Sequence, residues 1–134
     1  MRSLALGTVA GILFASLPIM HANSHANGAA VQDKVLRHVV MYKFKDDCTQ
    51  AQIDEVVATF AGLPKKIDTV VGFESGTNVS QEGKSEGFTH IFVVTFRDEA
   101  GRDAYLVHPA HEAYVNVVRD RREKVLVFDY WTEA

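Results

Sequence analysis

Residues 88–96 read Phe88-Thr89-His90-Ile91-Phe92-Val93-Val94-Thr95-Phe96 and form the strongest predicted β-strand of the chain. Most of these residues are β-branched or aromatic, as is typical of strands. Successive side chains of a strand point to opposite faces of a sheet. One face of this strand therefore carries His90, Phe92, Val94 and Phe96. The other face carries Ile91 and Val93, so His90 belongs to an apolar face.

Residues 37–45 predict a first strand with the same two-sided pattern. One face of this strand carries His38, Val40, Tyr42 and Phe44, and the other face carries Val39 and Met41. Because the two faces are almost equally apolar, we expect both to be covered. The second cover is expected to come from another subunit.

The segment between these two strands predicts a helix, a weaker strand and a loop. Thr49 and Gln52 have the spacing of a capping box, which starts a helix that Gly62 and Pro64 end. A weaker strand follows at residues 70–79, where Gly72 and Gly76 indicate a bulge or a close backbone approach. Residues 80–87 are polar and predict a solvated loop. The apolar stripe of the helix consists of Ile53, Val56, Val57, Phe60 and Leu63.

The C-terminal part predicts a pair of helices and a last strand. Asp98 is placed to cap a helix that ends near Val107, because Pro109 disfavours a helical residue before it and favours a new helix start. The mixed charges of residues 119–124 predict a solvated turn. Residues 125–131 then predict an apolar strand.

The predicted order is strand, helix, strand, strand, helix pair, strand. This is the α+β split βαβ arrangement, a four-stranded antiparallel sheet with helices on one face only. In a monomer the helix-free face would expose an apolar patch, which soluble monomers seldom tolerate. We therefore expect a homodimer through the helix-free sheet face. The patch comprises Val39, Met41, Ile91 and Val93.

Length and composition fit one ordinary globular domain. The chain has 134 residues, and its net charge of -3 makes nucleic acid an unsuitable partner. Cys48 is the single cysteine, which excludes an internal disulfide and a cysteine-based structural metal site.

The first residues predict a secretory signal of bacterial type. Arg2 precedes an apolar run from residue 4 to residue 20, and small residues follow it. Cleavage after Ala26 fits best, with Ala22 and Ala30 as alternatives. An uncleaved membrane anchor is disfavoured, because the run is shorter than a membrane span and contains helix breakers. We expect a signal peptide at residues 1–26, a flexible tail at 27–34, and a secreted or periplasmic product without a stable membrane anchor.

Candidate site residues gather at the joint between the two C-terminal helices. Tyr105 lies in the last turn of the first helix, His108 in the joint and His111 in the first turn of the second helix. A bend there would direct Tyr105 and His111 towards one pocket. Arg97 and Arg102 lie near the start of the first helix, where they would attract an anionic substrate or remain solvated.

Four segments together resemble the stress-responsive dimeric α/β-barrel domain family. The resemblance covers about residues 35–131, and we assign residues 35–134 to this domain. It implies a ferredoxin-like subunit that pairs into a dimeric α/β barrel. The segments are Arg37-His38-Val39-Val40-Met41-Tyr42-Lys43-Phe44-Lys45-Asp46, Glu86-Gly87-Phe88-Thr89-His90, His108-Pro109-Ala110-His111 and Val125-Leu126-Val127-Phe128-Asp129-Tyr130.

The same resemblance implies roles for single residues. A plant polyketide cyclase of this family catalyses an aldol cyclisation without cofactor or metal. Its catalytic tyrosine and histidine correspond to Tyr105 and His111, and two of its pocket histidines correspond to His38 and His90. We therefore expect a ligand pocket lined by His38, His90, Phe92 and His108, with no cofactor and no metal.

Three functions remain open from the sequence. The first is an exported barrel protein that binds a small apolar molecule in its His/Tyr-lined pocket. The second is a cofactor-independent cyclase or lyase-like enzyme, in which His111 acts as general base and Tyr105 donates to a developing oxyanion. The third is a metal site made by four histidines, which the lack of a paired metal-ligand spacing disfavours.

Overall fold

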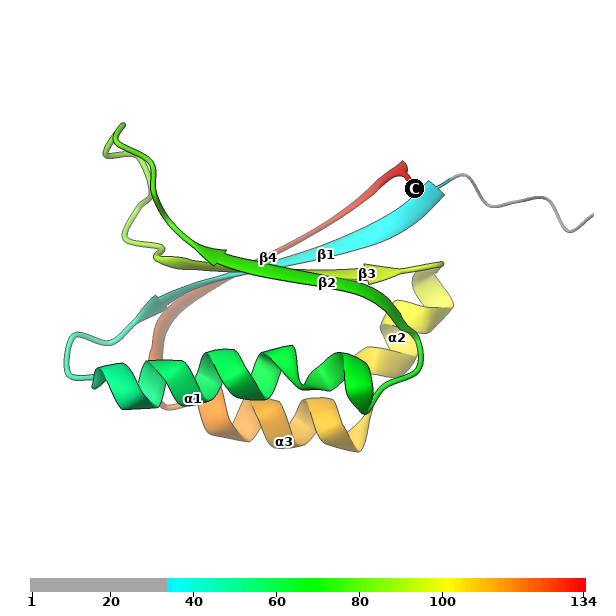
Figure 1. The fold of residues 1–134 in the computed structure, drawn as a ribbon, viewed down its shortest axis with the longest axis horizontal. Helices are drawn as coiled ribbons and strands as arrows, with labels where there is room; N and C mark the ends of the chain where they lie inside the picture. Colours follow the sequence, from blue (N-terminus) through cyan, green and yellow to red (C-terminus); the bar gives the residue numbers. More distant parts are fainter. Residues whose placement is uncertain (1–33) are drawn as a thin grey trace, which may run out of the picture.

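The computed structural model describes residues 34–134, so the predicted signal peptide and all but the last residue of the predicted tail lie outside the described residues. The strands form one antiparallel sheet in the order β2-β3-β1-β4, and the helices cover one of its faces (Figure 1). This confirms the α+β class and the predicted order. The elements are β1 (Lys34–Phe44), α1 (Gln50–Ala61), the 3-10 turn η1 (Leu63–Lys65), β2 (Val70–Thr77), β3 (His90–Phe96), α2 (Glu99–Leu106), α3 (Pro109–Val118) and β4 (Arg122–Glu133).

The predicted alternation of side chains in the central strands is confirmed. In β1 every second residue from Leu36 to Phe44 is buried beneath the helices. β3 lies beside it, and His38 faces Val94 across the pair. The helix side of the sheet therefore carries the core, whose largest buried rings belong to Phe60, Phe92, Phe96, Tyr105 and Tyr114.

The local signals at the helix ends are also confirmed. Thr49 and Gln52 form the capping box of α1, and Asp98 accepts a hydrogen bond from the backbone N–H of Gly101 at the start of α2. α2 ends at Leu106 and α3 begins at Pro109, so His108 occupies the joint. This sharp joint turns α3 back along the sheet (Figure 1).

Gly72 marks the predicted bulge in β2. The pairing of β2 with β3 shifts register between Val70 and Gly72. A Cβ atom on Gly72 would lie 3.1 Å from Thr95 Oγ1, closer than ordinary side-chain contacts. The glycine therefore allows both the bulge and the close approach of the two strands.

The predicted turn at residues 119–124 is wrong in its second half. Arg122 already pairs with Phe44, and Lys124 pairs with Lys43, so β4 begins three residues earlier than predicted. β1 continues to Phe44 and offers these residues a backbone partner, which outweighs their polar character. An ion pair of 2.8 Å between Lys43 and Glu123 supports this end of the sheet.

The helix-free face of the sheet is apolar, as predicted. Val39, Met41, Ile91 and Val93 lie on it and are only partly buried. β4 extends the patch with Leu126 and Phe128, and 62% of Phe128 is exposed. No helix within residues 34–134 is long and apolar enough to cross a membrane.

Candidate active site

A cavity of about 320 Å³ lies on the helix side of the sheet, against β1, β4, α2 and α3. β4 is an edge strand, and its helix-facing valines remain accessible from the cavity. The walls combine valines and a phenylalanine with a group of ionisable side chains. The lining residues with polar groups are His38, Tyr42, Arg102, Tyr105, His111, Tyr114, Arg122 and Asp129.

His38 and Asp129 form a hydrogen-bonded pair in this cavity. They face each other across the β1–β4 pairing, and His38 Nδ1 lies 2.7 Å from Asp129 Oδ1. Because an ionised carboxylate only accepts hydrogen bonds, Nδ1 carries the proton and Nε2 keeps its lone pair when the ring is neutral. Arg102 Nη1 lies 3.0 Å from the other carboxylate oxygen of Asp129. Asp129 is thus held by a strand and a helix, and it fixes the orientation of the buried His38 ring.

Tyr105 projects from α2 into the space between two histidines. Its ring centroid lies 5.9 Å from that of His38 and 4.5 Å from that of His111. The side chain is fully buried, and its hydroxyl has no hydrogen-bond partner within residues 34–134. Burial raises the pKa of the Tyr105 phenol well above its usual range, so the group is a neutral donor at pH 7.

His111 lies in the first turn of α3 and is half-buried. Its Nδ1 lies 3.1 Å from the backbone carbonyl oxygen of Leu106, so Nδ1 carries the proton and donates it to that oxygen. Nε2 therefore keeps a free lone pair. Burial lowers the pKa of His111, against the opposing effect of the Leu106 hydrogen bond. The ring is consequently neutral at pH 7, as a general base requires.

His108 has a different place from the other residues of the joint. It is the N-cap of α3, and its Nδ1 accepts a hydrogen bond of 3.1 Å from the backbone N–H of Ala110. It is not among the residues that line the cavity. His108 therefore acts as a helix cap, because its ring accepts a hydrogen bond from a backbone N–H that has no partner within the first turn of α3.

His90 and Phe92 lie away from the His38 group. His90 faces Tyr42 in the β1–β3 register, four residues along β1 from His38, which is about 13 Å. Its ring packs edge-to-face on Phe44 at 5.1 Å, and its pKa is lowered by burial. Phe92 is buried and stacks on Phe60 at 4.4 Å, so it supports the cavity wall from behind.

A larger hollow of about 390 Å³ lies under the loop between β2 and β3. Met41, Ile91 and Leu126 form its base on the helix-free face, and the loop residues cover it from the side. Of the histidines in the part of the chain that the structure describes, only His90 lines it. This hollow belongs to the exposed apolar patch and lacks the paired ionisable groups of the first cavity.

The structure thus brings together three of the predicted site residues: His38, Tyr105 and His111. Sequence reasoning missed Asp129, Tyr42, Tyr114 and Arg122. Asp129 had a usable signal, since it is the one charged residue inside the apolar run 125–131. Within residues 34–134 no group of three or more histidine, cysteine or acidic side chains is placed to hold a metal ion.

Comparison with known proteins supports the predicted family. The sequence profile described as Stress responsive A/B Barrel Domain matches residues 36–132. Olivetolic acid cyclase from Cannabis sativa is 39% identical over 95 residues, which are 71% of this chain and 94% of that protein.

Two solved structures share this fold and also resemble the chain in sequence. The crystal structure of At3g17210 from Arabidopsis thaliana is 33% identical, has a TM-score of 0.70, and matches 74% of this chain and 96% of its own. A dimeric ferredoxin-like protein of unknown function from Jannaschia sp. CCS1 is 33% identical, has a TM-score of 0.63, and matches 72% and 97%. The architecture is therefore that of ferredoxin-like subunits that occur as dimers.

Proposed function

Because the chain belongs to the stress-responsive A/B barrel domain family, we propose that it binds a small, largely apolar carbonyl compound in the cavity of His38, Tyr105 and His111. There it moves a proton on the bound molecule without a cofactor, as a cyclase or lyase does. The similarity to olivetolic acid cyclase supports this class of reaction.

The unpaired hydroxyl of Tyr105 carries the proposal. Buried hydroxyl groups in folded proteins nearly always have a hydrogen-bond partner, and leaving one without a partner costs about 1–3 kcal/mol. The Tyr105 hydroxyl has none within the described part of the chain, although the ring lines a cavity between two imidazoles. A carbonyl oxygen of a bound molecule would accept this hydrogen bond.

The positions of the three side chains support the following reaction. Nε2 of His111 takes a proton from a C–H beside the carbonyl group of the bound compound, and the ring becomes an imidazolium. The electron pair left behind moves to the carbonyl oxygen, where the Tyr105 hydroxyl stabilises the developing negative charge. His38 is oriented by Asp129 and presents Nε2 to the same space.

A binding protein without turnover is the second candidate function. It is favoured by the apolar part of the cavity wall, which would hold a small molecule that has no proton to transfer. This part of the wall consists of Val40, Phe60, Leu106, Val115, Val125 and Val127.

We also propose that two subunits pair through the helix-free sheet face. The exposed patch of Val39, Met41, Leu126 and Phe128 supports this interface, as does the dimeric state of the structural relative from Jannaschia. Residues 1–26 are proposed to direct export to the periplasm or the medium. Their support is the order of basic start, apolar run and small residues.

The two candidate functions differ in proton transfer. We would incubate the protein with 4-phenyl-2-butanone in D2O and follow deuterium uptake at the carbons beside the carbonyl by NMR. Wild-type protein is expected to accelerate the uptake above buffer, H111Q to abolish it, and Y105F to slow it while ketone binding persists. Binding of the ketone without any acceleration would contradict the catalytic proposal and favour the binding protein.

A further inference from the structure

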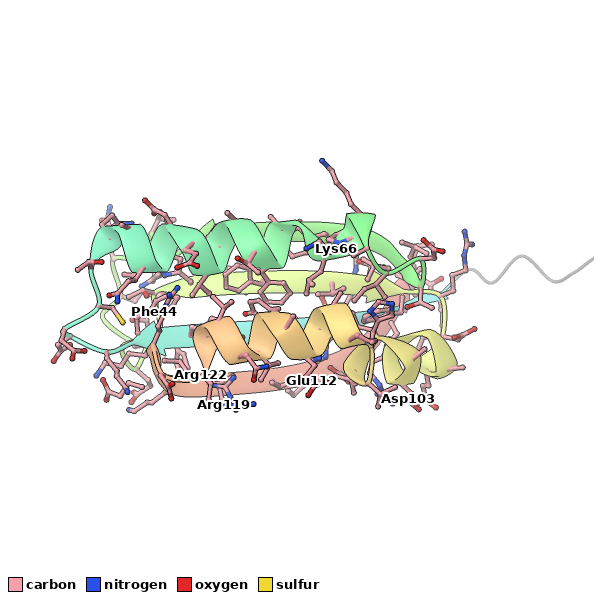
Figure 2. The ribbon with its side chains drawn as sticks, turned by 90° about the horizontal axis from the view of Figure 1, so that it is seen from below. Phe44, Lys66, Asp103, Glu112, Arg119 and Arg122 are labelled. Carbon is pink, nitrogen blue, oxygen red and sulfur yellow. The ribbon has the colours of Figure 1, made fainter. Side chains whose placement is uncertain are left out.

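The cavity has a second polar end at Arg122, and Tyr114, whose ring centroid lies 6.2 Å from that of His111, stands between the two ends. Arg122 begins β4 and lines the cavity together with Tyr42 and Tyr114. Figure 2 shows Arg122 beside the last turn of α3, whereas Asp103 marks α2 at the other end of that helix. The cavity therefore extends along α3, with ionisable groups at both ends.

The charge of Arg122 is not neutralised by the described part of the protein. No carboxylate of residues 34–134 lies within ion-pair distance of its guanidinium, although the side chain is half-buried. Two other arginines, in contrast, form ion pairs with carboxylates. Arg121 pairs with Glu55 at 2.7 Å, and Arg102 pairs with Asp103 and Asp129 at 2.9 and 3.0 Å. Arg122 is thus the cavity arginine that remains free to bind an anion.

Tyr42 and Tyr114 supply a hydrogen-bond donor beside this charge. Their hydroxyl oxygens are 2.6 Å apart, so one hydroxyl donates to the other. The hydroxyl that accepts still has its own proton, and the pair therefore has one donor left over. Burial raises the pKa of both phenols, so neither becomes a phenolate that would neutralise Arg122.

The two polar ends are separated by an apolar stretch. His38 and Tyr42 lie on the same face of β1, four residues or about 13 Å apart. Val40 lies between them on that face, and on β4 Val127 faces Val40 and Val125 faces Tyr42. A molecule that reaches both ends needs an apolar spacer between its two polar groups.

We propose that Arg122, with the spare donor of the Tyr42–Tyr114 pair, binds the carboxylate of the molecule that the cavity takes. The substrate class of the proposed reaction is then a carboxylic acid, with an apolar spacer between its carboxylate and the carbonyl group at Tyr105. A planar guanidinium matches a carboxylate in charge and geometry. The inference rests on the proposed function in one respect only, namely that the other polar group of the molecule is a carbonyl group at Tyr105.

The test compares a carboxylate with a neutral molecule of the same shape. Octanoate and octanamide would be titrated into the purified mature protein at pH 7 by isothermal calorimetry. A hydrogen-bonded charge pair strengthens binding by about ten- to a hundredfold, so wild-type protein is expected to prefer octanoate by that factor. R122Q is expected to lose the preference and to keep its affinity for octanamide, and Y42F to lose part of the preference.

Arg119 provides the matched control. It is exposed, lies three residues from Arg122 and does not line the cavity (Figure 2). R119Q removes the same unit charge, and its preference for octanoate is expected to equal that of wild type. Equal affinity of wild-type protein for the two probes would overturn the proposal, and so would an equal loss in R119Q and R122Q. The wild-type comparison decides even if R122Q does not fold.

The H111Q variant separates this proposal from the proposed function. His111 lies in the first turn of α3 and Arg122 beside its last turn, so H111Q should keep the preference for octanoate while it loses deuterium exchange on 4-phenyl-2-butanone. A preference for octanoate without exchange in wild type would uphold the carboxylate site and contradict catalysis. Exchange without the preference would do the opposite.

Discussion

Replacement of Asp129 by alanine should destabilise the fold more than its half-exposed position suggests. The substitution leaves the Nδ1–H of the buried His38 without its acceptor, which costs about 1–3 kcal/mol. It also removes an ion pair with Arg102, which is partly exposed and contributes about 0–1 kcal/mol. The sum is about 1–4 kcal/mol, equivalent to a decrease in Tm of roughly 5–30 °C for a domain of this size.

Two further variants separate the contributions. D129N keeps an oxygen that accepts from His38 but loses the charge, so it should cost about 1 kcal/mol. R102Q removes only the ion pair and should cost less than about 1 kcal/mol. The free energy of unfolding would be measured by urea titration at one protein concentration, because the stability of a dimer depends on concentration. The ¹⁵N shifts of the His38 ring would report its tautomer.

The reasoning fails if D129A unfolds within about 0.5 kcal/mol of wild type, since the His38 contact would then contribute little. It fails also if R102Q is as unstable as D129A. That result would place the main contribution of Asp129 in its ion pair with α2. An unchanged tautomer of His38 in D129A would show that the carboxylate does not select the protonated nitrogen.

Three other predictions concern the pH dependence of stability, the subunit interface and the signal peptide. Burial lowers the pKa of His111 and His90 in the folded state, so the unfolded chain binds protons more readily as pH falls below about 6.5. Tm should therefore be constant above that pH and decrease from pH 6.5 to 5. The decrease should be smaller in a H90Q/H111Q double variant. Val93→Asp places an unpaired charge in the helix-free face and should dissociate or unfold the dimer, as light scattering would reveal; a stable folded dimer would contradict the proposed interface. N-terminal sequencing of exported protein should find a chain that starts after Ala26, and a chain that starts at Met1 would refute the signal peptide.

The fold could be predicted because its signals are local. The alternation in residues 37–45 and 88–96, the capping box at Thr49 and the proline at the helix joint each act within a few residues. The strand ends were predicted less accurately, since Arg122–Lys124 join β4 only because β1 lies beside them. Their own composition favours a turn.

The candidate site could be predicted only in part, because it depends on register. Sequence spacing places His38 and His90 on the same face of neighbouring strands. The register then puts Val94 beside His38 and His90 beside Tyr42. Likewise, Asp129 lies 91 residues from His38 and meets it only through the β1–β4 pairing. No pattern within one segment contains that information.

The edge position of β4 has a consequence for how this family can diversify. Val125 and Val127 face the cavity from an edge strand and are 41% and 55% exposed, while the aromatic core packs around Phe60, Phe92 and Tyr114. Substitutions at the two valines change what the cavity accepts and remove little buried surface. The wall of the cavity on β4 can therefore change while the helices and central strands keep the protein folded.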